Sequence, residues 1–214
     1  MTTVAGVITR ARTSLSMVVI PLVLFAAPPL ARASLIISVQ SVGANSPSSA
    51  DALDIRLSNT GPGSVTLGSF SFGVSVTDPA ITFTSATIAT VMAPYVFAGQ
   101  SLFGPTISTS VPGQTLDASD ATFTFATIAG GTTVGLGHVF FSVAAGDTAG
   151  TKAVALAAFP TTELLDVNGS PMPFQNLNGT ITITATSSSV PQPSTILLVL
   201  TGITSLTLAR RHRR

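Results

Sequence analysis

Between residues 34 and 189 the chain alternates apolar and polar residues in short runs that are separated by turn residues. In ALDIRLSN, the apolar residues Leu53, Ile55 and Leu57 fall on one face, and the polar residues between them fall on the other. SFSFGVSV repeats this scheme with two phenylalanines and two valines, and an Asp-Pro turn signal follows it. Six further runs have the same character: SLIISVQSV, ITFTSATI, ATFTFATI, GHVFFSVA, KAVALAAF and GTITITAT. This period of two predicts β-strands with one buried face.

The number and spacing of these runs predict an all-β fold. Eight or nine strands with no amphipathic helix between them favour an antiparallel β-sandwich or jelly roll. Two segments echo each other, TFTSATIA at 82–89 and TFTFATIA at 122–129. Two copies are too few for a stacked repeat array. We interpret them as two similar core strands whose likeness reflects a chain rich in Thr, Ala and Ile.

The first 33 residues have the pattern of a secretory signal peptide. Two arginines precede an apolar run over residues 17–27, and the small-residue pattern Ala31-Arg32-Ala33 follows. This order predicts a signal-peptide helix in 1–33 with cleavage after Ala33. The apolar run is shorter than the roughly 20 residues of a membrane span, and the non-adjacent arginines favour the general secretory route. The alternative is an N-terminal anchor that is not cleaved.

The charges are unevenly placed along the chain. Seven of the nine basic residues lie near the ends, which leaves only Arg56 and Lys152 against eight acidic residues between 34 and 189. A body with a net charge of −6 is a poor partner for nucleic acid. The absence of cysteine excludes disulfides, thiol catalysis and thiolate metal sites. The body, with about 155 residues, is long enough to form one hydrophobic core.

His138 is the only histidine of the body. The alternation in GHVFFSVA places it on the same side as Phe140 and Ser142. A general base needs a nucleophile or an orienting carboxylate within reach, and its neighbours in sequence supply neither. We therefore interpret His138 as a structural or surface residue, and we predict no catalytic residue in the chain.

Two pairs of carboxylates lie near predicted strand ends, Asp51 with Asp54 and Asp117 with Asp120. Such pairs could hydrolyse glycosides or bind calcium, but glycosidases place their two acids across a groove and raise the pKa of one. We interpret these residues as solvated loop acids that keep an apolar protein soluble.

Asp166 and Asn168, in Asp-Val-Asn-Gly-Ser, are candidates for a calcium site, because that cation prefers carboxylate and amide oxygens. The stretch lacks the longer loop and closing glutamate of an EF-hand. An ordinary Asn-Gly β-turn is the favoured interpretation. We therefore predict no metal site and no cofactor.

Two stretches of the body, LDIRLSNTGPGSVTLGSFSFGVSVTDPAITFTSAT and LLDVNGSPMPFQNLNGTITI, resemble the opening and the end of cohesin-type modules. The resemblance covers most of residues 34–186. It implies a nine-stranded jelly-roll sandwich whose relatives bind dockerin modules or act as extracellular interaction domains. No dockerin-binding residue carries over by a matching motif.

The C-terminus contains three segments with distinct properties. A Ser/Pro linker over 187–193 leads away from the predicted sandwich. Residues 194–209 are largely apolar and would span about 24 Å as a transmembrane helix. Snorkelling arginines and local thinning can close the gap to the roughly 30 Å hydrocarbon core. The basic tail over 210–214 then acts as a stop on the cytoplasmic side.

This tail resembles the PEP-CTERM sorting signal of Gram-negative bacteria, which a membrane enzyme, exosortase, is thought to process. The residues that match the motif region are Val190, Pro191, Pro193, Ser194 and Thr195, and those of the basic stop are Arg210, Arg211, Arg213 and Arg214. Gln192 stands where the motif usually has glutamate. The change keeps the shape of the side chain but removes its negative charge, so we expect it to affect how efficiently the signal is processed. No LPxTG motif of the Gram-positive equivalent is present. The alternative is a C-terminal anchor that is never cut.

These observations predict a non-enzymatic, exported sandwich over 34–186 that its tail sorts to the cell envelope and releases into the extracellular polymeric material of a biofilm. Its expected partners are the membrane, through the C-terminal helix, an exosortase-type enzyme, and a polysaccharide or dockerin-like protein. One alternative is a carbohydrate-binding module or an extracellular polysaccharide hydrolase, and the hydrolase requires two carboxylates across a groove. Another is ice binding, which would require regular Thr rows on a flat sheet.

Overall fold

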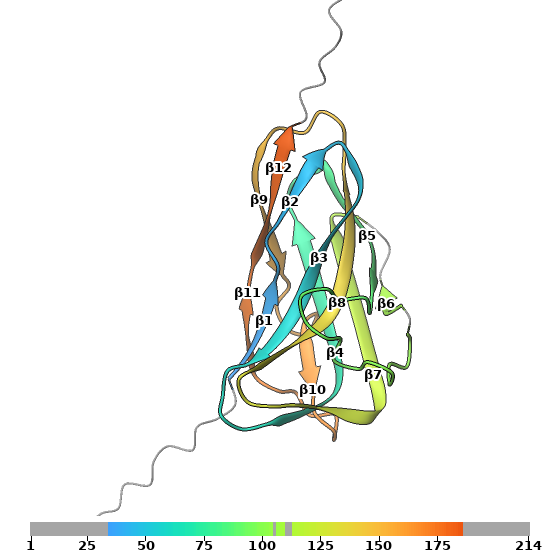
Figure 1. Ribbon diagram of the computed structural model, residues 1–214, viewed down its shortest axis with the longest axis vertical. Helices are drawn as coiled ribbons and strands as arrows, with labels where there is room; N and C mark the ends of the chain where they lie inside the picture. Colours follow the sequence, from blue (N-terminus) through green and yellow to red (C-terminus); the bar gives the residue numbers. More distant parts are fainter. Residues whose placement is uncertain (1–33, 105, 110–112, 186–214) are drawn as a thin grey trace, which may run out of the picture. The chain divides into compact units, whose positions relative to one another are not determined.

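The computed structural model describes residues 34–104, 106–109 and 113–185, and this part of the chain contains β-strands and no α-helix (Figure 1). The strands are β1 (Leu35–Val39), β2 (Val42–Ser46), β3 (Ser48–Asn59), β4 (Val65–Val76), β5 (Ile81–Thr87), β6 (Ser108–Thr109), β7 (Thr115–Ile128), β8 (Thr132–Val143), β9 (Gly150–Leu156), β10 (Glu163–Leu165), β11 (Phe174–Leu177) and β12 (Gly179–Ala185). The prediction of an all-β fold is confirmed. The two predicted terminal helices lie outside the described residues.

The strands form two sheets that face each other. Five strands form one sheet in the order β11-β1-β3-β8-β5, and the other sheet has the order β2-β12-β9-β4-β7-β6, with β10 paired to β4. Figure 1 shows β3 and β8 in one layer and β4 and β7 in the other. Most neighbouring strands are antiparallel, as the sequence predicts for a β-sandwich.

The strands at the two ends of the described chain pair with each other in both sheets. β1 pairs in parallel with β11 in the five-stranded sheet, where Leu35 lies opposite Phe174. β2 pairs in parallel with β12 in the second sheet, where Ser46 lies opposite Ala185. The eight alternating runs of the sequence correspond to β1, β3, β4, β5, β7, β8, β9 and β12, and the four short strands β2, β6, β10 and β11 bring the number of described strands to twelve.

The apolar positions of the alternating runs form the core between the sheets. Leu53, Ile55 and Leu57 on β3 and Phe70 and Phe72 on β4 are buried, as the period of two predicts. Other large side chains that are fully buried include Phe83, Phe97, Phe141, Ile37, Leu67, Ile81, Leu116 and Ile128. The core of the described chain runs from β1 to β12, so residues from both ends of the described range pack in one cluster.

The connection after β5 closes one side of the sandwich. Its side chains Tyr95 and Phe97 are buried against Phe70, with the rings of Phe70 and Phe97 5.6 Å apart. Tyr95 bridges to Gly135 of β8, and a β-carbon added at Gly135 would lie 2.5 Å from the hydroxyl oxygen of Thr90. Glycine at this position therefore allows the connection to lie directly against β8.

The two echoing segments have different structures. Phe83 of the first is fully buried on β5, whereas Phe123 of the second is 84% exposed. The register between β4 and β7 shifts between Leu67 and Ser69, which pair with Ala126 and Ala121, so residues 122–125 bulge out of the ladder. The prediction of two similar core strands is therefore wrong for the second segment.

Lys152 links β9 to two turns through their carboxylates. Its Nζ lies 2.5 Å from Oδ2 of Asp78 and 3.4 Å from Oδ1 of Asp147. The hydrogen bond from Lys152, supported by the backbone N–H of Ala80, lowers the pKa of Asp78 below its ordinary value. The same contact with Asp78 raises the pKa of Lys152, and Asp147 adds to this effect.

These pKa shifts set the pH range in which the contact stabilises the fold. The contribution of Asp78 is present above about pH 4, the ordinary pKa of aspartate, and is lost as the pH falls through its lowered folded-state pKa. The contribution of Lys152 to stability is lost only above about pH 10, where the unfolded lysine loses its proton. We therefore expect Lys152→Met to lower the melting temperature at about pH 7 more than at about pH 2. Thermal melts at both pH values measure this, and an equal loss at each would contradict it.

Candidate functional site

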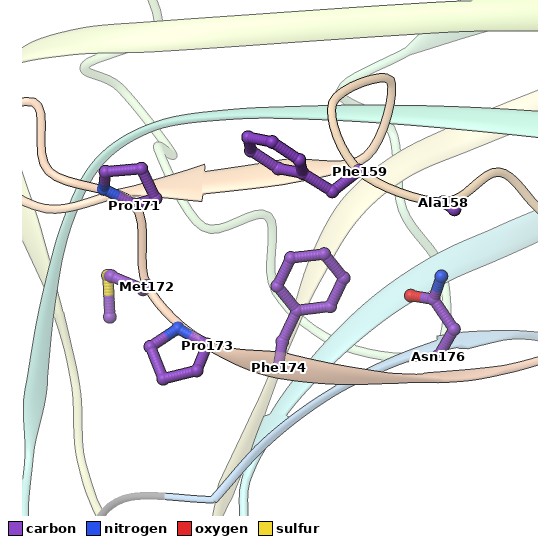
Figure 2. Close-up of a pocket in the computed structure, with 7 residues that line it drawn as sticks. All are labelled: Ala158, Phe159, Pro171, Met172, Pro173, Phe174 and Asn176. Carbon is purple, nitrogen blue, oxygen red and sulfur yellow. The ribbon is translucent and has the colours of Figure 1, made fainter.

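A hollow of about 500 Å³ lies beside β11 (Figure 2). Its lining comes from the connection after β9 and from the segment that leads into β11, and consists of Ala158, Phe159, Pro171, Met172, Pro173, Phe174 and Asn176. Figure 2 shows the rings of Phe159 and Phe174 pointing toward the same space. We call this the aromatic-proline hollow.

The backbone around the aromatic-proline hollow is well anchored. Phe174 begins β11 opposite Leu35 and packs against the core. Met172 donates its backbone N–H to the carbonyl of Leu164 at 2.8 Å. The side-chain amide of Asn176 donates to the carbonyl of Ala157 at 3.1 Å. Two prolines restrict the same segment further, because each fixes its own φ. The lining is therefore held in place before any ligand binds.

The chemistry of the aromatic-proline hollow is that of binding. None of the described residues that line it titrates near neutral pH, and Asn176 supplies the only polar side chain among them. Phe159 is 62% exposed, so its ring is accessible to a partner. Aromatic rings, proline and the adaptable thioether of Met172 favour contact with apolar side chains of a partner.

His138 has an orienting carboxylate, which reasoning from sequence neighbours missed. Nδ1 of His138 lies 2.6 Å from Oδ1 of Asp54, the residue opposite it in the β3–β8 register. The other carboxylate oxygen of Asp54 accepts the backbone N–H groups of Val91 and Met92 at 2.8 and 2.6 Å. Among the described residues, no Ser, Thr or Lys side chain hydrogen-bonds to His138. The pair therefore fixes the loop at Val91 and Met92, in line with the structural interpretation of this histidine.

The interpretation of Asp54 as a solvated loop acid is wrong. Its side chain is buried and accepts three hydrogen bonds, because the connection after β5 covers this part of β3. Asp51 lies opposite Phe141, whose side chain faces the core, whereas Asp54 lies opposite the outward His138. The two carboxylates of this pair therefore point away from each other.

Asp120 is also buried, which contradicts the prediction of a solvated acid. It faces the core from β7 and accepts the hydroxyl proton of Tyr95 at 2.5 Å. Burial, and then the Asp120 carboxylate, strongly raise the pKa of Tyr95. Asp117 is exposed on the opposite face of the same strand. The carboxylates of this pair also do not converge, so neither pair has the arrangement that the hydrolase alternative requires.

The stretch around Asp166 is a turn. Its carboxylate oxygen Oδ1 accepts the backbone N–H groups of Asn168 and Ser170 at 2.7 and 2.9 Å, and Gly169 has a φ of +73°. The carboxylate therefore stabilises the turn itself. Within the described ranges, no three metal-ligating side chains come together.

The predicted targeting signals lie outside the described residues. This applies to the cleavage site at Ala31 and Ala33, to the sorting motif at 190–195 and to the basic stop at 210–214. The part of the chain that the structure describes contains no helix of the length and apolarity needed to cross a membrane.

No protein-family model matches the chain, and no curated protein is similar to it in sequence. Several solved structures share its fold. CaCohA2 from Clostridium acetobutylicum is 20% identical, with a TM-score of 0.52 over 74% of this chain and 94% of its own. The seventh ScaB type I cohesin from Pseudobacteroides cellulosolvens is 11% identical, with a TM-score of 0.52 over 73% and 96%. The sixth cohesin of Acetivibrio cellulolyticus scaffoldin B, in complex with the Cel5 dockerin, is 16% identical, with a TM-score of 0.52 over 71% and 99%.

These similarities establish the class of fold. The described body is a cohesin-like β-sandwich, as the resemblance in sequence implied. At identities of 20% or less the likeness concerns the fold alone, and function has to be argued from the sites on this chain.

Proposed function

We propose that this chain is an exported, non-catalytic binding and structural module of the cell envelope or extracellular matrix of a Gram-negative bacterium. The observation that carries the proposal is the aromatic-proline hollow, which is preformed and apolar and has no titratable group among the described residues that line it. Such a site provides contact area and supplies no acid, base or nucleophile. The separated carboxylates of the sandwich support the same conclusion.

The partner proposed for this hollow is a polypeptide with an exposed apolar side chain. Burial of one such side chain between Phe159 and Phe174 removes apolar surface from water on both molecules. The cohesin of Acetivibrio cellulolyticus was solved with a dockerin, which supports a protein partner, including a dockerin-like one, for a sandwich of this class.

The proposed route to the envelope rests on the two ends of the sequence. The signal peptide directs export, and the apolar segment and arginines at 194–214 hold the exported chain in the inner membrane. An exosortase-type enzyme then acts at the motif around Gln192 and releases the sandwich. Retention of Val190, Pro191 and Pro193 supports recognition of the motif despite the missing glutamate charge.

Intact mass spectrometry of the chain from cells and from medium tests the sorting proposal. We expect a released species that begins at Ser34 and ends near Pro193. A species from Ser34 to Arg214, found only in membranes, would show that the tail is a permanent anchor. A chain that retains Met1 and stays in the cytoplasm would overturn export altogether.

A substitution in the aromatic-proline hollow tests the binding proposal. We expect Phe159→Ser to lower retention of the chain in the washed envelope and matrix fraction by about tenfold, because it removes the most exposed ring of the hollow. Quantitative immunoblots of cell, matrix and medium fractions measure this. The matched control is Val91→Ser, which changes another exposed apolar side chain outside the hollow. Equal retention of both variants would contradict the proposal.

A further inference from the structure

A second hollow, of about 220 Å³, lies on the outer face of the seven-stranded sheet. Here β4 lies between β7 and β10. Its lining consists of Ser69, Phe70, Ser71, Phe103, Ser119, Asp120, Ala121, Glu163 and Leu165. We call it the serine hollow. Unlike the aromatic-proline hollow, its described lining combines hydroxyl groups, the two acidic residues Asp120 and Glu163, and the exposed ring of Phe103.

The strand register arranges the polar residues of the serine hollow in a row. Glu163 of β10 lies opposite Ser71 of β4, and Ser71 lies opposite Ser119 of β7. Neighbouring strands are about 4.8 Å apart, so the row presents three polar side chains at regular spacing across the sheet. A second row next to it contains Ser69, which lies opposite Leu165 and Ala121.

These polar side chains retain their full capacity for hydrogen bonds. The side chains of Ser69, Ser71, Ser119 and Glu163 form no hydrogen bond with any described residue. Each serine hydroxyl can donate once and accept twice, and the carboxylate can accept on both oxygens. A ligand that fits here needs several groups that both donate and accept, which is the property of a hydroxyl.

An aromatic ring lies at the border of this row. Phe103 is 51% exposed, although it belongs to a segment that the sheet holds in place. The backbone N–H of Leu102 donates to the carbonyl of Ala121 at 3.0 Å, and Ser101 bridges to Thr122 of β7. The ring can therefore offer a fixed apolar surface next to the hydroxyl row.

We propose that the serine hollow binds one sugar ring of a neutral polysaccharide. A pyranose carries hydroxyl groups around its edge and has apolar faces made of C–H groups. Its hydroxyls would bond to the row of Glu163, Ser71 and Ser119, while one face packs on Phe103. A purely apolar ligand would instead bury these polar groups without partners, which costs free energy.

The charges of the described chain select a neutral polysaccharide over an acidic one. Arg56 and Lys152 are the only basic residues of the described ranges, and neither lines the serine hollow. Glu163 would repel the carboxylate of a uronic acid, and no cation of the lining offsets this repulsion. The site differs from the aromatic-proline hollow, so this proposal does not depend on the protein partner proposed above.

The test uses the full chain in a zwitterionic detergent that carries no sugar. The probes are cello-, manno- and xylo-oligosaccharides, with an oligogalacturonate as the acidic control. Isothermal calorimetry measures binding, and backbone amide shifts in NMR spectra map it. We expect at least one neutral probe to bind and to shift the amides of Ser71, Ser119 and Ala121, and we expect the acidic control to have no effect.

Three variants link binding to the serine hollow. Phe103→Ala should weaken binding about tenfold or more, since it removes the apolar contact. Ser71→Ala and Glu163→Gln should each weaken it by about two- to tenfold, the contribution of one hydrogen bond. The matched control is Phe159→Ala, which removes an exposed ring of the aromatic-proline hollow and should leave the affinity unchanged.

Three results would overturn the proposal. One is the absence of binding to every neutral probe at the highest soluble concentration, with amide spectra that show a folded chain. Another is binding that Phe159→Ala weakens and Phe103→Ala does not. The third is binding of oligogalacturonate that is as tight as that of the neutral probes.

Discussion

Asp54→Ala is expected to destabilise the sandwich by about 3–5 kcal/mol. The buried carboxylate joins β3 to His138 on β8 and to the backbone N–H groups of Val91 and Met92. Its removal leaves three donors without their partner at a site that the loop covers. Denaturation by urea, followed by far-UV circular dichroism, measures the change in the free energy of unfolding.

Comparison with a second variant, His138→Gln, separates the histidine contact from the loop contacts. His138→Gln alone should cost less than Asp54→Ala, because the two backbone N–H groups keep their acceptor. Hydrogen exchange at Val91 and Met92 should accelerate in Asp54→Ala and change little in His138→Gln. A cost for Asp54→Ala below about 1 kcal/mol, the net value of one ordinary hydrogen bond, would show that the carboxylate does not hold the loop.

The second large expected effect is on stability, and it compares equivalent phenylalanines in the two echoing segments, 82–89 and 122–129. We expect Phe83→Ala to lower the free energy of unfolding by about 3–5 kcal/mol, because the ring is fully buried against the core and its loss leaves a cavity. Phe123→Ala removes the same side chain from nearly the same local sequence and should change stability by no more than about 0.5 kcal/mol.

Urea unfolding of both variants under identical conditions tests this contrast. The two substitutions remove the same atoms, so the difference between them reports the location of each ring in the fold. A cost for Phe123→Ala close to that for Phe83→Ala would mean that residues 122–125 pair with β4 in solution and do not bulge out of the ladder.

The contrast between these segments also shows what local sequence can predict. Alternation identified the buried faces of β3 and β4, since Leu53, Ile55, Phe70 and Phe72 are all in the core. Alternation alone cannot tell Phe83 from Phe123, because the register shift opposite Leu67 decides which ring is buried. That shift depends on the pairing of two distant strands, which no window along the chain contains.

The sequence did not predict the burial of Asp54 and Asp120 for a related reason. Asp54 falls on the polar face of its strand, so a period of two places it in solvent. The loop at Val91 and Met92 covers it from 37 residues away and supplies the donors that make burial tolerable. The hydroxyl of Tyr95, 25 residues earlier, donates a hydrogen bond to Asp120 and makes its burial tolerable in the same way.

The two hollows differ in how visible they are in the sequence. The stretch SPMPF groups two prolines, a methionine and a phenylalanine without strand alternation, and this composition could have marked the aromatic-proline hollow. The serine hollow left no such signal, because Ser71, Ser119 and Glu163 lie on three strands and only the register aligns them.

The paired crossing of the terminal strands determines how the sandwich bears a mechanical load. β1 begins where Leu35 meets Phe174, and β12 ends where Ala185 meets Ser46. Tension applied at residue 34 and at residue 185 therefore slides β1 along β11 and β2 along β12. In this shear geometry the hydrogen bonds of both parallel pairs share the force and must break together, whereas a hairpin pulled from its open end unzips one bond at a time. A sandwich that is held at one end and pulled at the other is thereby built to resist extension.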